Sequence, residues 1–178
     1  MIGFLKYYLL NYIINRLPVY CIRRFYYTKV CRMKIGRTSF IGLDCRFYGD
    51  KIREIEIGEN CNIPWNCIFV CGAKIKIDDN VIFGHSVKIY TSDHDPDSPG
   101  FIRRDAEVHI KRNAWIASDS IVLKGVEVGE GAVISAGSVV TKSVGDFSIV
   151  AGNPAREIKK RRAKQFNYKV GKINFLSL

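Results

Sequence analysis

The chain has 178 residues, of which 47% are hydrophobic and 25% are charged, so it is long enough for one folded domain and is neither disordered nor fibrous. The net charge of +11 is concentrated in residues 1–43 and 156–178, each with eight Lys or Arg, whereas the segment between them holds 12 basic and 16 acidic residues. Two basic ends favour an anionic membrane surface or an acidic substrate at least as well as nucleic acid, for which no motif interleaving aromatic and basic residues is present. We therefore expect no nucleic-acid partner.

Residues 1–34 are predicted to form an amphipathic, basic and mainly helical segment. The longest run without a charge, residues 7–15, is well short of the roughly 20 residues that a spanning helix needs. A small-x-small cleavage site is also missing, which argues against a secretory signal. Two interpretations stay open, a helix packed on the body or a partner subunit and a helix on the cytoplasmic membrane face. The apolar positions with helical spacing are Leu5, Leu9, Tyr12, Ile13 and Leu17.

A repeat of six residues begins at Ile35 and ends at Val144. Eight Ile, three Val and one Phe recur at this spacing, and four residues after each stands a small or short side chain. Such a repeat fits a short strand followed by a sharp turn, with three repeats closing a triangular coil whose aliphatic residues stack inside. The sequence therefore predicts a β-helix. The aliphatic positions are Ile35, Ile41, Ile57, Ile63, Ile77, Phe83, Ile110, Ile116, Val122, Val128, Ile134 and Val140.

The repeat is interrupted in two places. Between Ile57 and Ile77 the chain has two residues more than one coil, which predicts a bulge at residues 72–74. After Ile89 the next aliphatic position is Ile110, so residues 91–105 are predicted to leave the coil as a loop. That loop contains two Pro and four Asp and cannot continue the β-helix. Inserted loops in repeat proteins often carry binding or chemistry.

The six cysteines are predicted to be reduced packing residues. No pair is spaced as Cys-x-x-Cys, and Cys45, Cys61 and Cys67 occupy the small interior position of the repeat. This indicates a reducing, cytoplasmic compartment and no metal site.

Three histidines could carry chemistry. His94 lies in the extruded loop between Asp93 and Asp95, where an adjacent carboxylate or carbonyl could fix its tautomer, and imidazole is the usual general base near neutral pH. A solvated loop histidine is the alternative from the residues alone. His85, at a turn of the repeat, favours a structural role or a subunit contact, and His109 directly precedes a coil.

Several motifs follow one another in residues 57–158: the repeats themselves and the segments TSDHDPD, NAWIASDSIVLKGVEVGEGAVISAGSVVTKSV and VAGNPAREI. Together they resemble hexapeptide-repeat acetyltransferases. The most similar group contains galactoside and maltose O-acetyltransferases and the O-acetyltransferases of surface polysaccharides. The resemblance implies an all-β fold, a left-handed parallel β-helix over residues 35–156, followed by a short basic tail, residues 157–178. It also implies acetyl-CoA as donor, a sugar or polysaccharide-precursor acceptor, and a homotrimer with active sites between subunits.

The resemblance also implies roles for individual residues. His94 matches the catalytic histidine, and the backbone N–H of Ser118 matches a donor to the thioester oxygen. Asn66 matches an asparagine that positions the acceptor, and Trp115 matches a tryptophan that walls the cleft. We also assign Asp93 to acceptor binding. An alternative to the acceptor role stays open for each residue: Asn66 as a turn asparagine, and Trp115 as an aromatic side chain on the coil surface. The residues matched to acetyl-CoA binding are Ala117, Ser118, Ala136, Gly137, Thr141, Lys142 and Arg156.

In the implied reaction, His94 takes the proton of an acceptor hydroxyl as it attacks the acetyl carbonyl, and no acyl-enzyme is formed. The tyrosine-rich basic N-terminal segment stands where the galactoside and maltose enzymes have a sugar-lining segment, and is more similar to polysaccharide-modifying members. An amino-sugar acceptor stays open. Two other classes are weighed: a non-catalytic β-helix scaffold, and a zinc-dependent carbonic anhydrase, whose closely spaced histidines this chain lacks.

Overall fold

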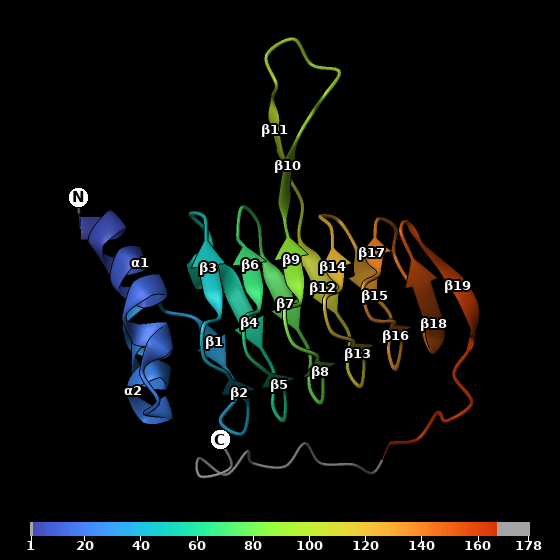
Figure 1. The fold of residues 1–178 in the computed structure, drawn as a ribbon, viewed down its shortest axis with the longest axis horizontal. Coiled ribbons are helices and arrows are strands. Elements are labelled where there is room, and N and C mark those ends of the chain that lie inside the picture. Colours follow the sequence, from blue (N-terminus) through green and yellow to red (C-terminus); the bar gives the residue numbers. More distant parts are fainter. Residues whose placement is uncertain (1, 167–178) are drawn as a thin grey trace.

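The computed structural model describes residues 2–166; Met1 and residues 167–178, the end of the predicted basic tail, lie outside the described residues. Stacked parallel strands wind into a β-helix, and two helices lie across its N-terminal end (Figure 1). A hairpin leaves the middle of the β-helix and projects away from it. The predicted parallel β-helix with a helical N-terminal segment is therefore confirmed.

Each coil contributes one strand to each of three sheets, which we name faces A, B and C. All neighbouring strands in these sheets are parallel except the last pair of face B. Face A contains β1 (Lys34–Ile35), β4 (Ile55–Ile57), β7 (Ile75–Ile77), β12 (Val108–Ile110) and β15 (Glu127–Val128). Face B contains β2 (Phe40–Ile41), β5 (Asn62–Ile63), β8 (Ile82–Phe83), β13 (Trp115–Ile116), β16 (Val133–Ile134), β18 (Ser148–Gly152) and β19 (Ala155–Lys160). Face C contains β3 (Arg46–Tyr48), β6 (Ile68–Val70), β9 (Lys88–Tyr90), β14 (Ile121–Val122) and β17 (Val139–Val140).

The interior is built as the repeat predicts. Of the twelve aliphatic positions, all except the partly buried Ile35 are buried, and so are all twelve small positions that follow them. Five cysteines are buried and unpaired, Cys21 alone being exposed. Burial raises the pKa of Cys61 to about 11 and that of Cys71 to about 12, so both thiols stay protonated and serve as packing groups.

The predicted insertions fall where the strand register shows extra residues. Ile57 pairs with Ile77, and Ile77 pairs directly with Ile110, so the residues between the last two form one coil plus the projecting hairpin of β10 (Ser92–His94) and β11 (Arg103–Asp105). A further insertion, which the two predicted interruptions do not include, occurs in the first coil: Ile35 pairs with Ile57, 22 residues later, and a 3₁₀ turn spans Ile52–Glu54 between them.

The C-terminal end of the described chain is a strand where the sequence predicts a tail. β19 runs antiparallel to β18 and pairs its Glu157 with Val150. It thereby pairs with the free edge of β18 and itself becomes the edge strand of face B.

The N-terminal segment forms α1 (Ile2–Tyr12), a 3₁₀ turn (Ile14–Arg16), α2 (Tyr20–Phe25) and a π-helical turn (Tyr26–Val30). None of the described helices is long and apolar enough to cross a membrane. The apolar side predicted for this segment is not the side that packs: Leu5, Tyr12 and Ile13 are exposed, whereas Asn11 and Asn15 are buried.

The helices turn polar side chains inward because the first coil has an open edge, whose carbonyl groups face them. The Asn11 amide donates to the carbonyl of Phe47 (2.8 Å) and accepts from its N–H (2.9 Å), and Asn15 donates to the carbonyl of Cys45. The buried guanidinium of Arg23 donates to the carbonyls of Ile41 and Gly42. Because buried backbone groups need partners, the polar side of the helices faces inward.

Candidate functional site

The hairpin that carries His94 is fixed where it leaves the coil. Thr91 is fully buried; its hydroxyl donates to the carbonyl of Val70 (2.7 Å) and accepts from the N–H groups of Gly72 (2.9 Å) and Ala73 (3.0 Å). A Cβ on Gly72 would lie 1.8 Å from Oγ of Ser92 and 2.4 Å from Oδ1 of Asp105, so a larger residue would displace these side chains of the hairpin. The predicted bulge at residues 72–74 thus holds the base of the predicted loop.

His94 is exposed near this base, in β10. Its ring stacks on Phe101 with ring centroids 4.5 Å apart and an interplanar angle of 4°. Phe101 is itself 62% exposed, so the pair presents one open imidazole face on the hairpin. An imidazole held by stacking in this way is oriented yet accessible to a substrate.

Arg104 engages the carboxylates on both sides of His94. Its guanidinium donates to both oxygens of Asp93 (2.9 and 3.2 Å) and lies 3.5 Å from Oδ1 of Asp95. The hydrogen bond from Arg104, with the charge of Lys124 nearby, holds the pKa of the Asp93 carboxyl below its ordinary value. Asp93 and Asp95 therefore order the hairpin through Arg104, and the structure describes no contact between either carboxylate and the imidazole.

Asn66, Ser118 and Gly137 lie together along another corner of the β-helix, in turns that lead from face B to face C. Gly137 donates its N–H to the carbonyl of Ser118 (2.9 Å), and Ala136 beside it is exposed. Asn66 and Gly137 have φ values of +63° and +68°, a region that Asn and Gly tolerate best. The turn thus accounts for an asparagine at position 66 by itself, and the acceptor role of Asn66 stays a prediction.

Trp115 lies on the outer side of face B, just before this corner. Its side chain is 45% exposed, and its register neighbours are Ile82 and Val133. In the same row of turns as Ser118, Trp65 stacks on His85 of the next coil with centroids 4.9 Å apart. Trp115 therefore stands beside the row of turns that contains Ser118, and the Trp65–His85 pair lies within that row, which fits one wall of a cleft.

The residues predicted to bind the nucleotide end of acetyl-CoA lie elsewhere. Thr141 and Lys142 follow β17 at the corner from face C to face A, the same corner from which the hairpin leaves. Lys142 and Arg156 line one cavity of about 270 Å³, together with Ser143, Gly145 and Glu157. Two cationic side chains from separate elements thus meet at one hollow, as an anionic group requires.

The predicted site residues form two groups that one chain does not bring together. His94, Asp93, Thr141 and Lys142 belong to the corner between faces C and A. The second group belongs to the turns between faces B and C, or directly precedes them: Asn66, Trp115, Ala117, Ser118, Ala136 and Gly137. Each corner carries half of the implied site.

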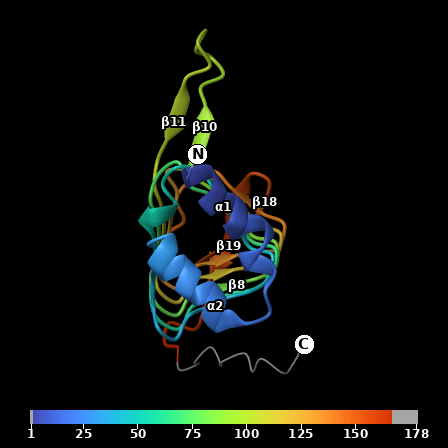
Figure 2. The ribbon, with the colours of Figure 1, turned by 90° about the vertical axis from the view of Figure 1, so that its left-hand side faces the viewer.

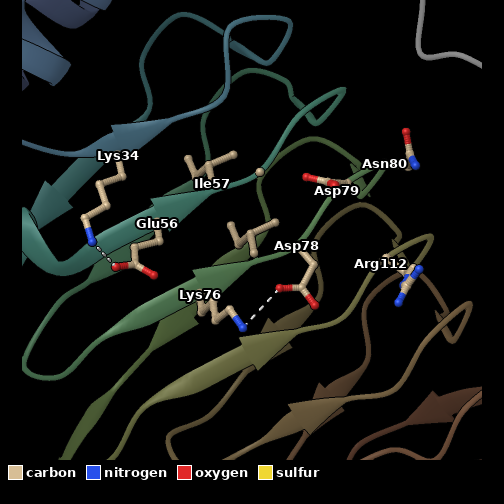
Figure 3. A pocket seen from close by; sticks show the side chains of 10 residues that line it. Lys34, Glu56, Ile57, Lys76, Asp78, Asp79, Asn80 and Arg112 are labelled. Atoms are coloured by element: carbon tan, nitrogen blue, oxygen red, sulfur yellow. Dashed lines mark hydrogen bonds and ion pairs between the residues drawn. The ribbon is translucent and has the colours of Figure 1, made fainter.

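A larger groove of about 490 Å³ lies along face A (Figure 3) and contains none of the predicted site residues. Most of its charged groups are paired within the chain: Lys34 with Glu56 (2.7 Å), Lys76 with Asp78 (3.5 Å) and Arg112 with Glu130 (3.5 Å). His109 beside the groove also contacts Asp78 (3.0 Å). Within residues 2–166, no cluster of three His, Cys, Asp or Glu side chains could hold a metal ion.

Comparisons with known proteins agree with the fold and the repeat. A family model described as bacterial transferase hexapeptide (six repeats) matches residues 107–142. The solved maltose O-acetyltransferase from Clostridium difficile 630 is 32% identical to the chain, with a TM-score of 0.78 over 89% of this chain and 83% of that one. This chain belongs to the hexapeptide-repeat acetyltransferase family.

Two further relatives support membership of the hexapeptide-repeat acetyltransferase family. A member from Vibrio cholerae O1 biovar eltor, solved in complex with acetyl-coenzyme A, is 25% identical with a TM-score of 0.80, over 89% of this chain and 86% of that chain. A candidate acetyltransferase from Schizosaccharomyces pombe is 37% identical over 109 residues, which are 60% of this chain and 53% of the relative. The match thus spans about half the length of that curated relative.

Several residues around His94 in this hexapeptide-repeat acetyltransferase could not be found from the sequence. Arg104 and Phe101 meet Asp93 and His94 only because the hairpin folds back on itself, with Asp93 opposite Arg104, and Lys124 reaches Asp93 from the chain that follows β14. The buried Thr91 is easier to single out, since it is the first residue of the predicted loop.

Proposed function

We propose that this chain transfers an acetyl group from acetyl-CoA to a hydroxyl of a sugar or a surface-polysaccharide precursor, with His94 as the general base. The observation that carries the proposal is the exposed imidazole on an anchored hairpin, at the one large insertion in a hexapeptide-repeat acetyltransferase. The maltose O-acetyltransferase relative supports a sugar hydroxyl, and the relative solved with acetyl-coenzyme A supports the donor.

The proposed reaction is a direct transfer. The His94 imidazole removes the hydroxyl proton while the acceptor oxygen forms a bond to the acetyl carbon. The backbone N–H of Ser118 donates to the oxyanion of the tetrahedral intermediate; losing such a donor typically costs about 3 kcal/mol. The intermediate then breaks its carbon–sulfur bond, and the CoA thiolate takes the proton from the imidazolium. The products are an acetyl ester and CoA.

Two copies of the chain are needed for this reaction, because one chain presents the two halves of the site at different corners. Face C lies between these corners, and its outer side is mostly apolar and partly exposed, with Arg46 and Lys88 as its outward charged side chains. Face A, by contrast, presents outward Lys34, Glu56, Lys76, His109 and Glu127. The outward apolar residues of face C are Ile68, Val70, Tyr90, Ile121, Leu123 and Val139.

We propose a homotrimer with the three C faces around its axis. In this arrangement one edge of each face C meets the opposite edge of the next copy. The edge with Ser118 and Ala136 would therefore approach the His94 hairpin of a neighbouring copy, which completes three identical sites. The apolar outer side of face C supports this packing, since such surface is commonly covered by a partner.

The proposed activity is tested with the purified chain, acetyl-CoA and panels of oligosaccharides, nucleotide sugars, lipid-linked saccharides and amino sugars. We expect free CoA thiol to be released at least tenfold faster with one hydroxyl-bearing saccharide than without acceptor, because His94 removes a hydroxyl proton. Alkaline lability of the product identifies an ester. Turnover only with amino sugars would replace the hydroxyl with an amine acceptor, and no turnover with any acceptor would contradict the proposal.

Replacing Lys142 or Arg156 with alanine is expected to raise the KM for acetyl-CoA about tenfold while kcat changes little, because a lost charge-assisted contact is worth about 1.5 kcal/mol. Both side chains line the same small cavity, so the double variant should weaken binding further. Lys76→Ala on face A, which removes a cation from the other groove, serves as the control. An unchanged KM in both single variants would place the acetyl-CoA phosphates elsewhere.

A further inference from the structure

The N-terminal end of the molecule presents an apolar surface that the proposed function does not use. Among the described residues, thirteen large apolar side chains are exposed, and seven of these lie between residues 5 and 25. Figure 2 shows α1 and α2 in front of the stacked coils, across the end of the β-helix. We name the seven side chains the end patch: Leu5, Tyr8, Tyr12, Ile13, Val19, Ile22 and Phe25.

The end patch leaves apolar side chains exposed although the same helical segment also buries Leu10 and Tyr27. On α1, Leu5, Tyr8 and Tyr12 share one outward side, and on α2, Ile22 and Phe25 do the same, with exposed fractions of 57% for Leu5 and 62% for Phe25. The inward side contains the buried polar groups that satisfy the first coil. Since large apolar side chains gathered at one end of a protein favour an interaction site, this end is suited to a partner or an apolar medium.

The charge around the end patch indicates which partner fits. Residues 1–43 contain eight Lys or Arg and no Asp or Glu. Lys29 and Arg32 are exposed and have no ion pair within the described part of the chain. A second copy docked through this end would bring two basic surfaces together, with like charges opposed. These residues fit an anionic bilayer better than a second copy of the chain. A bilayer offers an apolar interior to the exposed side chains and anionic headgroups to the cations.

We infer that the end patch binds an anionic membrane surface. Its aliphatic and aromatic side chains enter the boundary between headgroups and acyl chains, and Lys29 and Arg32 contact the lipid phosphates. In the proposed homotrimer the coil axes run along the threefold axis, so three end patches face the same bilayer and their weak contacts add. The inference rests on the proposed function only for this gain in avidity.

The test is flotation of the full chain with vesicles of phosphatidylglycerol and phosphatidylcholine in equal parts, compared with vesicles of phosphatidylcholine alone. We expect the chain to float with the anionic vesicles and to stay in solution with the neutral ones. A triple variant with Leu5→Ser, Ile22→Ser and Phe25→Ser should bind the anionic vesicles at least tenfold more weakly. A double variant with Lys29→Gln and Arg32→Gln should also bind them more weakly, and its binding should depend less on salt concentration.

The matched control is Ile102→Ser with Ile158→Ser, which removes two equally exposed isoleucines far from the end patch and should leave flotation unchanged. Thermal unfolding of each variant checks that it folds. Turnover of acetyl-CoA with a soluble acceptor should be the same in the triple variant and the parent, which separates this inference from the proposed function. A parent chain that floats with neither vesicle, a triple variant that floats as well as the parent, or association of copies through the end patch without flotation would overturn the inference.

Discussion

Replacing His94 with alanine is expected to lower kcat about a thousandfold, because the acceptor hydroxyl then keeps its proton as it attacks. The dissociation constant for acetyl-CoA should change little, since Lys142 and Arg156, the groups proposed to hold its phosphates, line a cavity that does not include His94. The measurement is thiol release at saturating acetyl-CoA with the acceptor that the screen identifies. Retention of full activity would remove His94 from the mechanism.

The structure also explains why this variant should fold normally. His94 is exposed, and the hairpin is held at its base by Thr91 and along its strands by Arg104 bound to Asp93. His109→Ala is the matched control, since that imidazole belongs to face A and contacts Asp78. The control should lose no more than a few-fold in kcat, whereas a comparable loss in both variants would indicate a general structural effect.

Replacing Phe69 with alanine is expected to lower the free energy of unfolding by about 3–5 kcal/mol. Phe69 is fully buried in β6, where its ring stacks on Phe47 with centroids 5.1 Å apart and lies 6.4 Å from the ring of Phe83. Coils above and below confine the resulting cavity, so the interior cannot collapse into it easily. Urea unfolding at a fixed protein concentration measures the loss.

Phe101→Ala provides the matched control for this substitution. It deletes the same side chain from an exposed position on the hairpin, and we expect a loss below about 1 kcal/mol. Because Phe101 stacks on His94, the control should lower kcat while stability is kept. Equal stability of the parent and the Phe69 variant would contradict the description of the interior as a continuous packed column.

The coil could be predicted because its rules are local. Ile57, Ile77 and Ile110 must point inward at a fixed step, and the register pairs them one above another. The orientation of α1 could not be predicted in this way. It depends on the unpaired carbonyls of the first coil, which Asn11 and Arg23 satisfy, and this requirement exceeds the preference for burying Leu5.

The candidate site was predictable to the extent that it follows breaks in the repeat. His94 stands out because it follows Ile89, where the chain leaves the coil. The contact of Arg104 with Asp93 depends on strand register inside the loop, which the loop sequence does not specify. The separation of His94 from Ser118 follows from the corner at which each residue lies, and only the closed triangular coil defines these corners.

In the proposed homotrimer, one copy supplies His94 to each site and another supplies the edge with Ser118 and Ala136. Two inactive chains test this arrangement: His94→Ala, and Ala136→Trp, which fills the proposed acetyl-CoA groove at an exposed position. Unfolded together in equal amounts and refolded, they should regain about a quarter of the parent activity, because random mixing pairs an intact His94 with an intact Ala136 edge in that fraction of sites. A mixture no more active than the two variants refolded separately would contradict a site shared between copies.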